Sequence, residues 1–300
     1  MKTAWIKCAL VSAAAAFAAG VFLNVDACQM MKAEAAAMNE RSYEVDKLNI
    51  PEDAVRLVVV EADGLSANVS LYVKAGTASG NETVSGAGSG TASWLEAVST
   101  DDGLIGRKGM GKTAEGDEKT PAGLYLMNTP FGTAAAQEGF PENYLQVDGR
   151  YYWNGDSASD RYNQLVNTDT YNSFDKGKSE HLATYGGVSY HYCIDTGYNK
   201  EGTPNRGSAL FLHCSAGKNT AGCIAIPEAS MVGIMKGYVE GKTYILLDTR
   251  GNFAQYYRTE ENSAEADADI AATIQLAEGD TAAERIDTRK GPCILSGSCE

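Results

Sequence analysis

The chain has 300 residues, of which 44% are hydrophobic and 21% are charged, a composition typical of one or two folded domains with a sizeable core. Its 25 basic and 39 acidic residues give a formal net charge of -14, which argues against nucleic acid or anionic lipid as the main partner. Half of this charge lies at one end, because residues 259–300 contain ten acidic and three basic residues.

The first 28 residues have the three parts of an export signal. Lys2 and Lys7 are followed by an alanine-rich apolar run and then by small residues ending at Ala27. The apolar run is shorter than the roughly 20 residues of a membrane-spanning helix, so we predict a cleaved signal at 1–28 and an extracytoplasmic, secreted or cell-envelope protein. A lipoprotein signal, with a membrane anchor on Cys28, and cleavage after Ala35 are alternatives.

The next segments predict a linker, one mostly-β domain and a tail. Residues 29–53 are polar and alanine-rich, which is typical of a linker. Runs rich in β-branched residues, bounded by turn residues, predict strands; they cover 55–62, 67–76, 124–127, 186–199, 207–214 and 242–250. The Gly/Ser-rich stretch 77–93 predicts a loop, after which Trp94 returns to the core.

One short helix is predicted between residues 227 and 241. Met231, Ile234, Met235 and Tyr238 recur at helical spacing after Pro227, which is favourable in a first helical turn. Strands outnumber helices, so the predicted fold is a mostly-β domain at 54–250. The acidic segment 251–300 is predicted to be a disordered tail.

A histidine and two cysteines lie close together in LFLHCSAGKNTAGCIAIP, residues 210–227. Alternate residues of a strand face opposite sides, so Phe211 and His213 share one face and Cys214 faces the other. The polar loop that follows can return the chain so that Cys223 meets the imidazole. A Cys/His nucleophile needs this arrangement, because the thiolate is the reactive form and an unassisted thiol has a pKa of about 8.5.

Gly222 has a separate purpose in this interpretation. Without a Cβ it allows a substrate to approach the backbone closely, so the N–H groups of Gly222 and Cys223 are candidates to stabilise an oxyanion. The aromatic and polar stretch 151–167 is typical either of a groove wall, with Tyr162 and Asn163 as substrate contacts, or of a surface loop packed on its own rings.

Other interpretations of these residues stay open. A buried cysteine and a histidine at a strand end are often purely structural. Zinc is a rival, because five side chains supply nitrogen and sulfur ligands: His191, Cys193, His213, Cys214 and Cys223. Their spacing contains no C-x-x-C pair, and we expect no metal and no organic cofactor.

Six cysteines remain after removal of a signal that ends before Cys28, and outside the cell they can pair. The close pair Cys293 and Cys299 predicts a small loop in the tail, and Cys193 with Cys214 predicts a bridge between adjacent strands. Cys223 is then the odd thiol, and an odd thiol in an exported protein is consistent with reactivity.

The segments FLHCSAGKNTAGCIAIP and GMGKTAEGDEKTPAGLYL together resemble the L,D-transpeptidase catalytic domain of bacterial cell-wall enzymes. The resemblance spans roughly residues 54–250 and is most specific at the Thr-Ala-Gly-Cys run 220–223. It implies a β-sandwich with short helices, Cys223 as nucleophile and His213 as its base, with the Gly222 and Cys223 backbone as oxyanion hole. Ala221 departs from the commoner form of the motif, which has a histidine there.

The resemblance implies a two-step acyl transfer on peptidoglycan stem peptides. Cys223 attacks the carbonyl before the terminal D-Ala, D-Ala leaves, and an amine on a neighbouring stem takes the thioester to give a 3-3 cross-link. Thr220 joins Tyr162 and Asn163 as a candidate substrate contact. An L,D-carboxypeptidase, a cysteine peptidase or amidase, and a non-catalytic wall-binding module with a Cys214–Cys223 disulfide are the alternatives; the oligomeric state is left open.

Overall fold

The computed structural model describes residues 41–76, 78–79, 82–83 and 93–259. The predicted signal, Cys28, the Cys293–Cys299 pair and the acidic tail beyond residue 259 lie outside the described residues. Residues 41–46 and 50–255 belong to one compact unit, and residues 47–49 and 256–259 to a second, in which Leu48 and Tyr257 form an antiparallel bridge. Among the described helices, none is long and apolar enough to cross a membrane.

The fold is mostly β, as predicted. The strands are β1 (Arg56–Asp63), β2 (Ser66–Lys74), β3 (Ala78–Ser79), β4 (Glu82–Thr83), β5 (Trp94–Leu104), β6 (Gly123–Leu126), β7 (Pro130–Gly132), β8 (Leu145–Gln146), β9 (Tyr151–Trp153), β10 (Leu165–Asn167), β11 (Glu180–His181), β12 (Cys193–Asp195), β13 (Phe211–Cys214), β14 (Ile224–Ile226) and β15 (Thr243–Thr249). The helices and 3₁₀ turns are η2 (Val45–Lys47), η3 (Lys176–Lys178), α3 (Leu182–Tyr185), η4 (Gly187–Tyr190), α4 (Glu228–Gly237) and η5 (Phe253–Tyr256).

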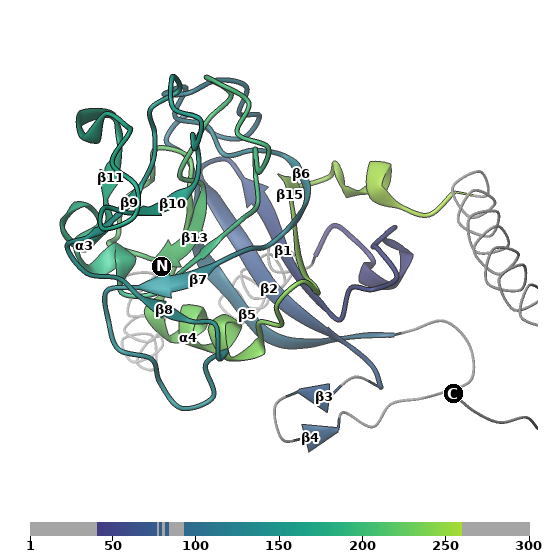
Figure 1. Cartoon of the computed structure of the whole chain (residues 1–300). Coiled ribbons are helices and arrows are strands. Elements are labelled where there is room, and N and C mark those ends of the chain that lie inside the picture. The colour runs from purple at the N-terminus through teal and green to yellow at the C-terminus, as the bar shows by residue number, and fades with distance from the viewer. Residues whose placement is uncertain (1–40, 77, 80–81, 84–92, 260–300) are drawn as a thin grey trace, which may run out of the picture. The chain divides into compact units, whose positions relative to one another are not determined.

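A curled, mixed sheet of ten strands forms the body of the larger unit (Figure 1), in the order β6-β15-β1-β2-β5-β14-β13-β12-β7-β8. β1 pairs in parallel with β15 and antiparallel with β2. β13 lies between β12, which is antiparallel, and β14, which is parallel. A three-stranded sheet, β10-β9-β11, and the β3–β4 pair complete the described strands.

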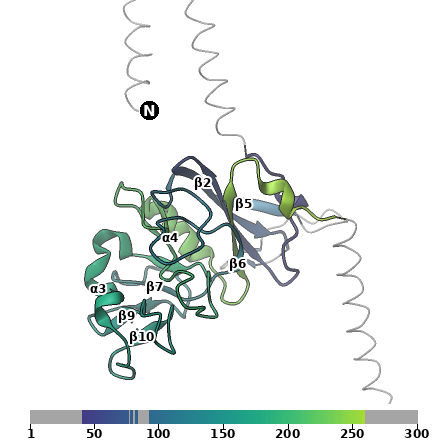
Figure 2. The same cartoon turned by 90° about the horizontal axis from the view of Figure 1, so that it is seen from above.

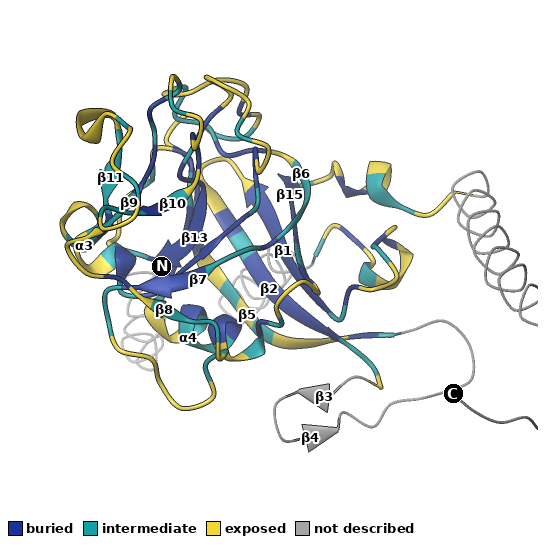
Figure 3. Cartoon of the chain, in the orientation of Figure 1, coloured by how far each residue is buried: buried dark blue, intermediate teal, exposed yellow. Residues whose placement is uncertain are grey.

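Two hydrophobic clusters pack on opposite faces of the β12–β13 region. One joins alternate residues of β1, β2 and β15 to the buried side of α4, including Met231 and Ile234. Figure 2 shows α4 beside β2 and β5, and Figure 3 shows β1, β2 and β15 as mostly buried. The other cluster joins Phe131 and Phe211 of the large sheet to Trp153 of β9 and to Tyr190. Each face of β13 therefore packs against one of the two hydrophobic clusters.

Most predicted elements are confirmed, and the differences have identifiable reasons. The strand predicted at 207–214 is confirmed only at Phe211–Cys214, as β13, because Gly207 and Ala209 have positive φ values of 125° and 55°. The predicted loop at 77–93 contains the short β3–β4 pair. The predicted strands at 55–62, 67–76, 124–127 and 242–250 and the helix at 227–241 correspond to β1, β2, β6, β15 and α4. The predicted strand at 186–199 is instead the turn η4 followed by β12, because Gly187 has a positive φ of 51°. The eleven-residue strand β5 was not predicted, because most of its residues are exposed or half-buried and no apolar alternation marks it.

Candidate active site

The structure places His213 and Cys223 on one face of neighbouring strands. In the parallel ladder Leu212 pairs with Ile224 and His213 with Ala225, so Cys223 immediately precedes β14 and shares a face with Ala225. Cys223 packs against the cluster that contains Phe211 and Tyr190. The His213 ring meets the same Tyr190, with ring centroids 5.8 Å apart and an interplanar angle of 72°. Tyr190 therefore borders both predicted catalytic side chains.

The Cys223 thiol is held by backbone groups. It donates to the carbonyl of Ala209 at 3.1 Å and accepts from the N–H of Phe211 at 3.3 Å. Burial, and after it the negative charge of Glu180, raise the pKa of Cys223 to about 12, although the Phe211 N–H and the charge of Lys112 oppose the shift. The resting side chain is therefore a neutral thiol. Within the described residues it makes no hydrogen bond to the His213 imidazole.

The tautomer of His213 follows from one hydrogen bond. Its Nδ1 lies 2.8 Å from the carbonyl oxygen of Cys214. A carbonyl only accepts, so Nδ1 carries the proton and Nε2 is left as the basic nitrogen. Burial lowers the pKa of His213, because the charged imidazolium loses its hydration. The imidazole is therefore neutral near pH 7 and able to accept a proton at Nε2.

Three cysteines of the described chain are free thiols, and the predicted Cys193–Cys214 bridge is wrong. Cys193 is directly opposite His213 in the antiparallel β12–β13 pair, so it faces the Phe211 cluster. Cys214 faces the opposite cluster, as predicted, and its thiol approaches the carbonyl of Tyr192 at 3.7 Å. The two sulfur atoms therefore lie on opposite faces of the sheet. The Cys214–Cys223 disulfide of the scaffold alternative is also absent.

Thr220 organises the turn that leads to Cys223. Its hydroxyl accepts from the N–H of Gly222 at 3.0 Å and donates to the carbonyl of Cys223 at 2.6 Å. The N–H of Gly222, one of the two predicted oxyanion donors, is thus already bonded within the turn. The oxyanion roles of Gly222 and Cys223, and a substrate contact by Thr220, stay predictions.

Gly222 is required by the protein's own packing. Its φ is +146°, and a Cβ at this position would lie 2.8 Å from the carbonyl oxygen of Lys119 and 3.1 Å from Leu210 Cδ1. The structure thus gives a packing reason for glycine at this position, because the neighbouring chain segment occupies the space of a Cβ. Room for substrate at Gly222 stays a prediction.

Substitution of Gly222 by alanine is therefore expected to destabilise the fold. We expect Gly222→Ala to lower the free energy of unfolding by about 2–4 kcal/mol, from backbone strain plus the clash with Lys119. Gly217→Ala is the matched control: it lies in the same loop with a φ of +73°, and a Cβ there meets nothing within 4 Å. Urea unfolding measures both variants, and equal losses would contradict the close-contact explanation.

Tyr162 and Asn163 are engaged inside the protein. Tyr162 is 2% exposed; its hydroxyl donates to the carboxylate of Glu115 and accepts from the N–H of Gly207 at 3.2 Å. The Asn163 amide makes four hydrogen bonds, one of which, at 3.0 Å, fixes the N–H of Ala209. Asn163 thereby holds the residue whose carbonyl accepts the Cys223 thiol. Direct contact of either side chain with substrate stays a prediction.

Glu180 is a residue of this region that the sequence did not indicate. The Tyr190 hydroxyl donates to its carboxylate, and burial raises the pKa of Glu180 to about 7 although this hydrogen bond opposes the shift. Glu180 lies in a short polar segment without a recognisable motif, and only the β9–β11 pairing brings it to this side of the sheet. It is a titratable carboxyl group whose negative charge raises the pKa of Cys223.

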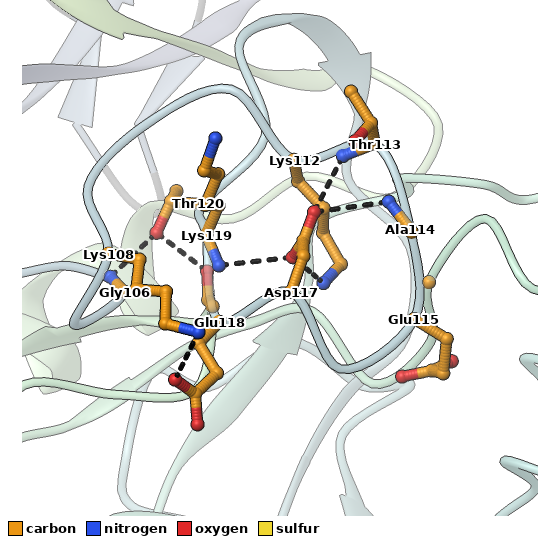
Figure 4. A network of polar contacts seen from close by, with 12 residues as sticks. Gly106, Lys108, Lys112, Thr113, Ala114, Glu115, Asp117, Glu118, Lys119 and Thr120 are labelled. Carbon is orange, nitrogen blue, oxygen red and sulfur yellow. Dashed lines mark hydrogen bonds and ion pairs between the residues drawn. The ribbon is translucent and has the colours of Figure 1, made fainter.

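Lys112 supplies a positive charge from the loop between β5 and β6. Its Nζ lies 2.8 Å from Oδ1 of Asp117, and only 2% of the lysine side chain is exposed. Figure 4 shows that Asp117 also accepts three backbone hydrogen bonds, from Thr113, Ala114 and Lys119. Burial alone would raise the pKa of Asp117, but these four donors outweigh it and hold the pKa below its usual range. The loop is therefore internally fixed.

The structure offers no site for the zinc interpretation within the described residues. No group of three or more His, Cys, Asp or Glu side chains lies close enough there to hold a metal ion. His191 pairs with Glu228 of α4 at 3.0 Å.

Among known proteins, the chain is similar to several solved structures. No protein-family model and no curated protein matches the chain. The helical cell shape determining protein Pgp2 from Campylobacter jejuni is similar in two crystal structures. For the structure of a mutant the TM-score is 0.41 at 13% sequence identity, and the match covers 81% of this chain and 61% of the Pgp2 chain. For the second structure the TM-score is 0.39 at 13% identity, and the match covers 76% of this chain and 56% of the Pgp2 chain.

Bd1075 from Bdellovibrio bacteriovorus is similar with a TM-score of 0.36 at 12% identity, over 79% of this chain and 61% of that one. The chain thus spans less than two thirds of the length of each of these proteins. Such likeness assigns no role to individual residues, so the chemistry has to be argued from the site itself.

Proposed function

We propose that the protein is a cysteine acyltransferase that acts on peptidoglycan stem peptides. The observation that carries the proposal is the pairing of β13 and β14, which brings Cys223 and a neutral His213, whose unprotonated nitrogen is Nε2, to one face of the sheet. The substrate class is proposed from the resemblance of the Thr-Ala-Gly-Cys segment, residues 220–223, to L,D-transpeptidases.

In the first step, the Cys223 sulfur attacks the carbonyl that joins the third stem residue to the terminal D-Ala. The thiol leaves its hydrogen bond with Ala209 and transfers its proton to Nε2 of His213 as the carbon–sulfur bond forms. Collapse of the tetrahedral intermediate breaks the carbon–nitrogen bond. The imidazolium returns the proton to the departing amine of D-Ala, and a thioester on Cys223 remains.

In the second step, an amine of a neighbouring stem attacks the thioester carbonyl. His213 takes a proton from this amine and returns it to sulfur when the carbon–sulfur bond breaks, so the free thiol is restored. The product is a 3-3 cross-link. Water as acceptor gives a shortened stem by the same route, so the first step is common to the transpeptidase and the carboxypeptidase. The non-catalytic alternative loses support, because Cys214 and Cys223 are free thiols.

The decisive test is product analysis with stem tetrapeptides as donor and acceptor. We expect the full chain to release D-Ala and to form a cross-linked peptide dimer, detected by mass spectrometry, and Cys223→Ala to form neither. Cys214→Ala is the matched control, because it removes a free thiol on the other face of the sheet, and it should retain activity. Release of D-Ala without dimer would assign a carboxypeptidase, and cleavage of another bond would assign a peptidase or amidase.

An exported location also belongs to this proposal, since peptidoglycan lies outside the cytoplasmic membrane. It rests on the signal-like segment 1–28, with membrane attachment only if Cys28 carries a lipid.

A further inference from the structure

Thr120 joins two loops that are far apart in the sequence. It ends the segment 106–120 and is completely buried. Its hydroxyl accepts from the N–H of Gly106 at 2.8 Å and donates to the carbonyl of Gly222 at 2.7 Å, across 102 positions of the chain. Figure 4 shows Thr120 beside the hydrogen-bonded Asp117 loop. A buried hydroxyl that both accepts and donates in this way has a single orientation.

The carbonyl that Thr120 holds belongs to the peptide unit of the nucleophile. The C=O of Gly222 and the N–H of Cys223 are the two ends of one planar, trans peptide group, and no cis peptide occurs in the described chain. The N–H of Cys223 therefore points opposite to the carbonyl of Gly222. A hydrogen bond that fixes this carbonyl also fixes the direction of the Cys223 N–H.

Thr120 is in turn fixed by its own loop. Its N–H donates to the carbonyl of Gly109 at 2.9 Å, and its carbonyl accepts from Gly111 at 2.8 Å. A second link ties the same loop to the nucleophile turn, because the N–H of Arg107 donates to the carbonyl of Thr220 at 3.0 Å. The position of the Thr120 hydroxyl is thus set by hydrogen bonds within the protein.

We propose that Thr120 is a positioning residue, which aims the Cys223 N–H at the oxyanion that forms when the thiol attacks a carbonyl. The proposal rests on the proposed function, because only acyl transfer creates an oxyanion at Cys223. Since the N–H of Gly222 is bonded to Thr220, the N–H of Cys223 is the predicted donor that this arrangement leaves to the substrate. A preorganised donor is effective only if it points at the oxyanion before the reaction.

The test compares two reactions of the same thiol in the full chain. Acylation by a carbapenem passes through an oxyanion, whereas alkylation by iodoacetamide displaces iodide at a saturated carbon and forms none. Intact mass follows the first reaction, and peptide mass spectrometry at Cys223 follows the second. Misdirection of one donor typically slows a reaction by about 10- to 100-fold. We expect this loss for acylation of Thr120→Val, with alkylation changed by less than about threefold.

Three further variants separate positioning from general damage to the fold. Thr120→Ser keeps the hydroxyl and should restore acylation, and Thr120→Ala should show the same split between the two rates as Thr120→Val. Thr243→Val is the matched control: Thr243 is equally buried, accepts from the N–H of Val239 at 2.7 Å and donates to the same residue's carbonyl at 2.8 Å. It should leave both rates unchanged.

The outcomes are distinct for the two proposals. If the native chain is acylated and Thr120→Val and Thr120→Ala are acylated at the same rate, the positioning role of Thr120 is overturned, and the proposed function is not affected. Parallel loss of acylation and alkylation, or an equal loss in Thr243→Val, would also overturn it, since both indicate general distortion. A native chain that is alkylated but never acylated would refute the proposed function, and the positioning role would fall with it.

Discussion

Replacement of Cys223 by alanine is expected to abolish covalent modification of the protein by a carbapenem. In the native chain, the sulfur opens the lactam ring and forms a thioester, so the intact mass rises by that of the whole drug. The alanine variant has no nucleophile at the end of the Thr-Ala-Gly-Cys turn, and no mass increase should appear. The measurement is intact-protein mass spectrometry after incubation at neutral pH.

The two buried thiols provide the control for this experiment. Cys193 and Cys214 are free, 0% and 1% exposed respectively, and neither is part of the turn that carries Cys223. Cys214→Ala should therefore be acylated like the native protein. Full modification of Cys223→Ala would show that another residue is the nucleophile, and we would then abandon the assignment.

Replacement of His213 by alanine is expected to slow acylation by about 10²- to 10⁴-fold at pH 7, the usual contribution of a positioned general base. With the pKa of Cys223 raised to about 12, only about one thiol in 10⁵ is ionised at pH 7. Attack therefore requires a base that takes the proton as sulfur reacts, and Nε2 of His213 is the candidate. Intact mass against time gives the rate.

The pH dependence gives an independent signature of this base. Burial lowers the pKa of His213 below its ordinary value of 6.5, so the native imidazole should lose its proton-accepting form only below about pH 6.5. Native acylation should then fall on the acid side and be level above it. The alanine variant depends on the thiolate alone, and its rate should rise about tenfold per pH unit towards pH 12.

His191→Ala is the matched control for the histidine experiment. Its imidazole is 39% exposed and pairs with Glu228 rather than with the site, so its loss should leave the acylation rate unchanged. A His213→Ala variant that retains the native rate and the native pH profile would show that another group accepts the proton.

The sequence predicted the strands that have regular apolar patterns. β1, β2 and β15 are buried along most of their length and rich in β-branched residues, so local preference and tertiary packing agree. The strand β5 was not predicted, because it is stabilised by pairing with β2, and this pairing is a contact between distant parts of the sequence. The segment 186–199 was overpredicted, since Gly187 and its neighbours form a turn before β12 begins.

The sequence by itself determined which faces the central residues occupy. Alternation along one strand places His213 and Cys214 on opposite sides, and the short polar loop returns Cys223 to the adjacent strand, as the structure has it. This inference needs only local geometry, because side chains alternate with a period of two. The choice of His213 and Cys223 as the candidate pair was therefore possible without a structure.

The tertiary structure decided which groups surround that pair. Thr120 reaches the carbonyl of Gly222 from 102 residues away, and the β9–β11 pairing brings Glu180 to the side of Tyr190. The predicted Cys193–Cys214 bridge was wrong because the register of β12 sets Cys193 opposite His213. Strand register and loop contacts arise between distant segments, so no pattern within one segment specifies them.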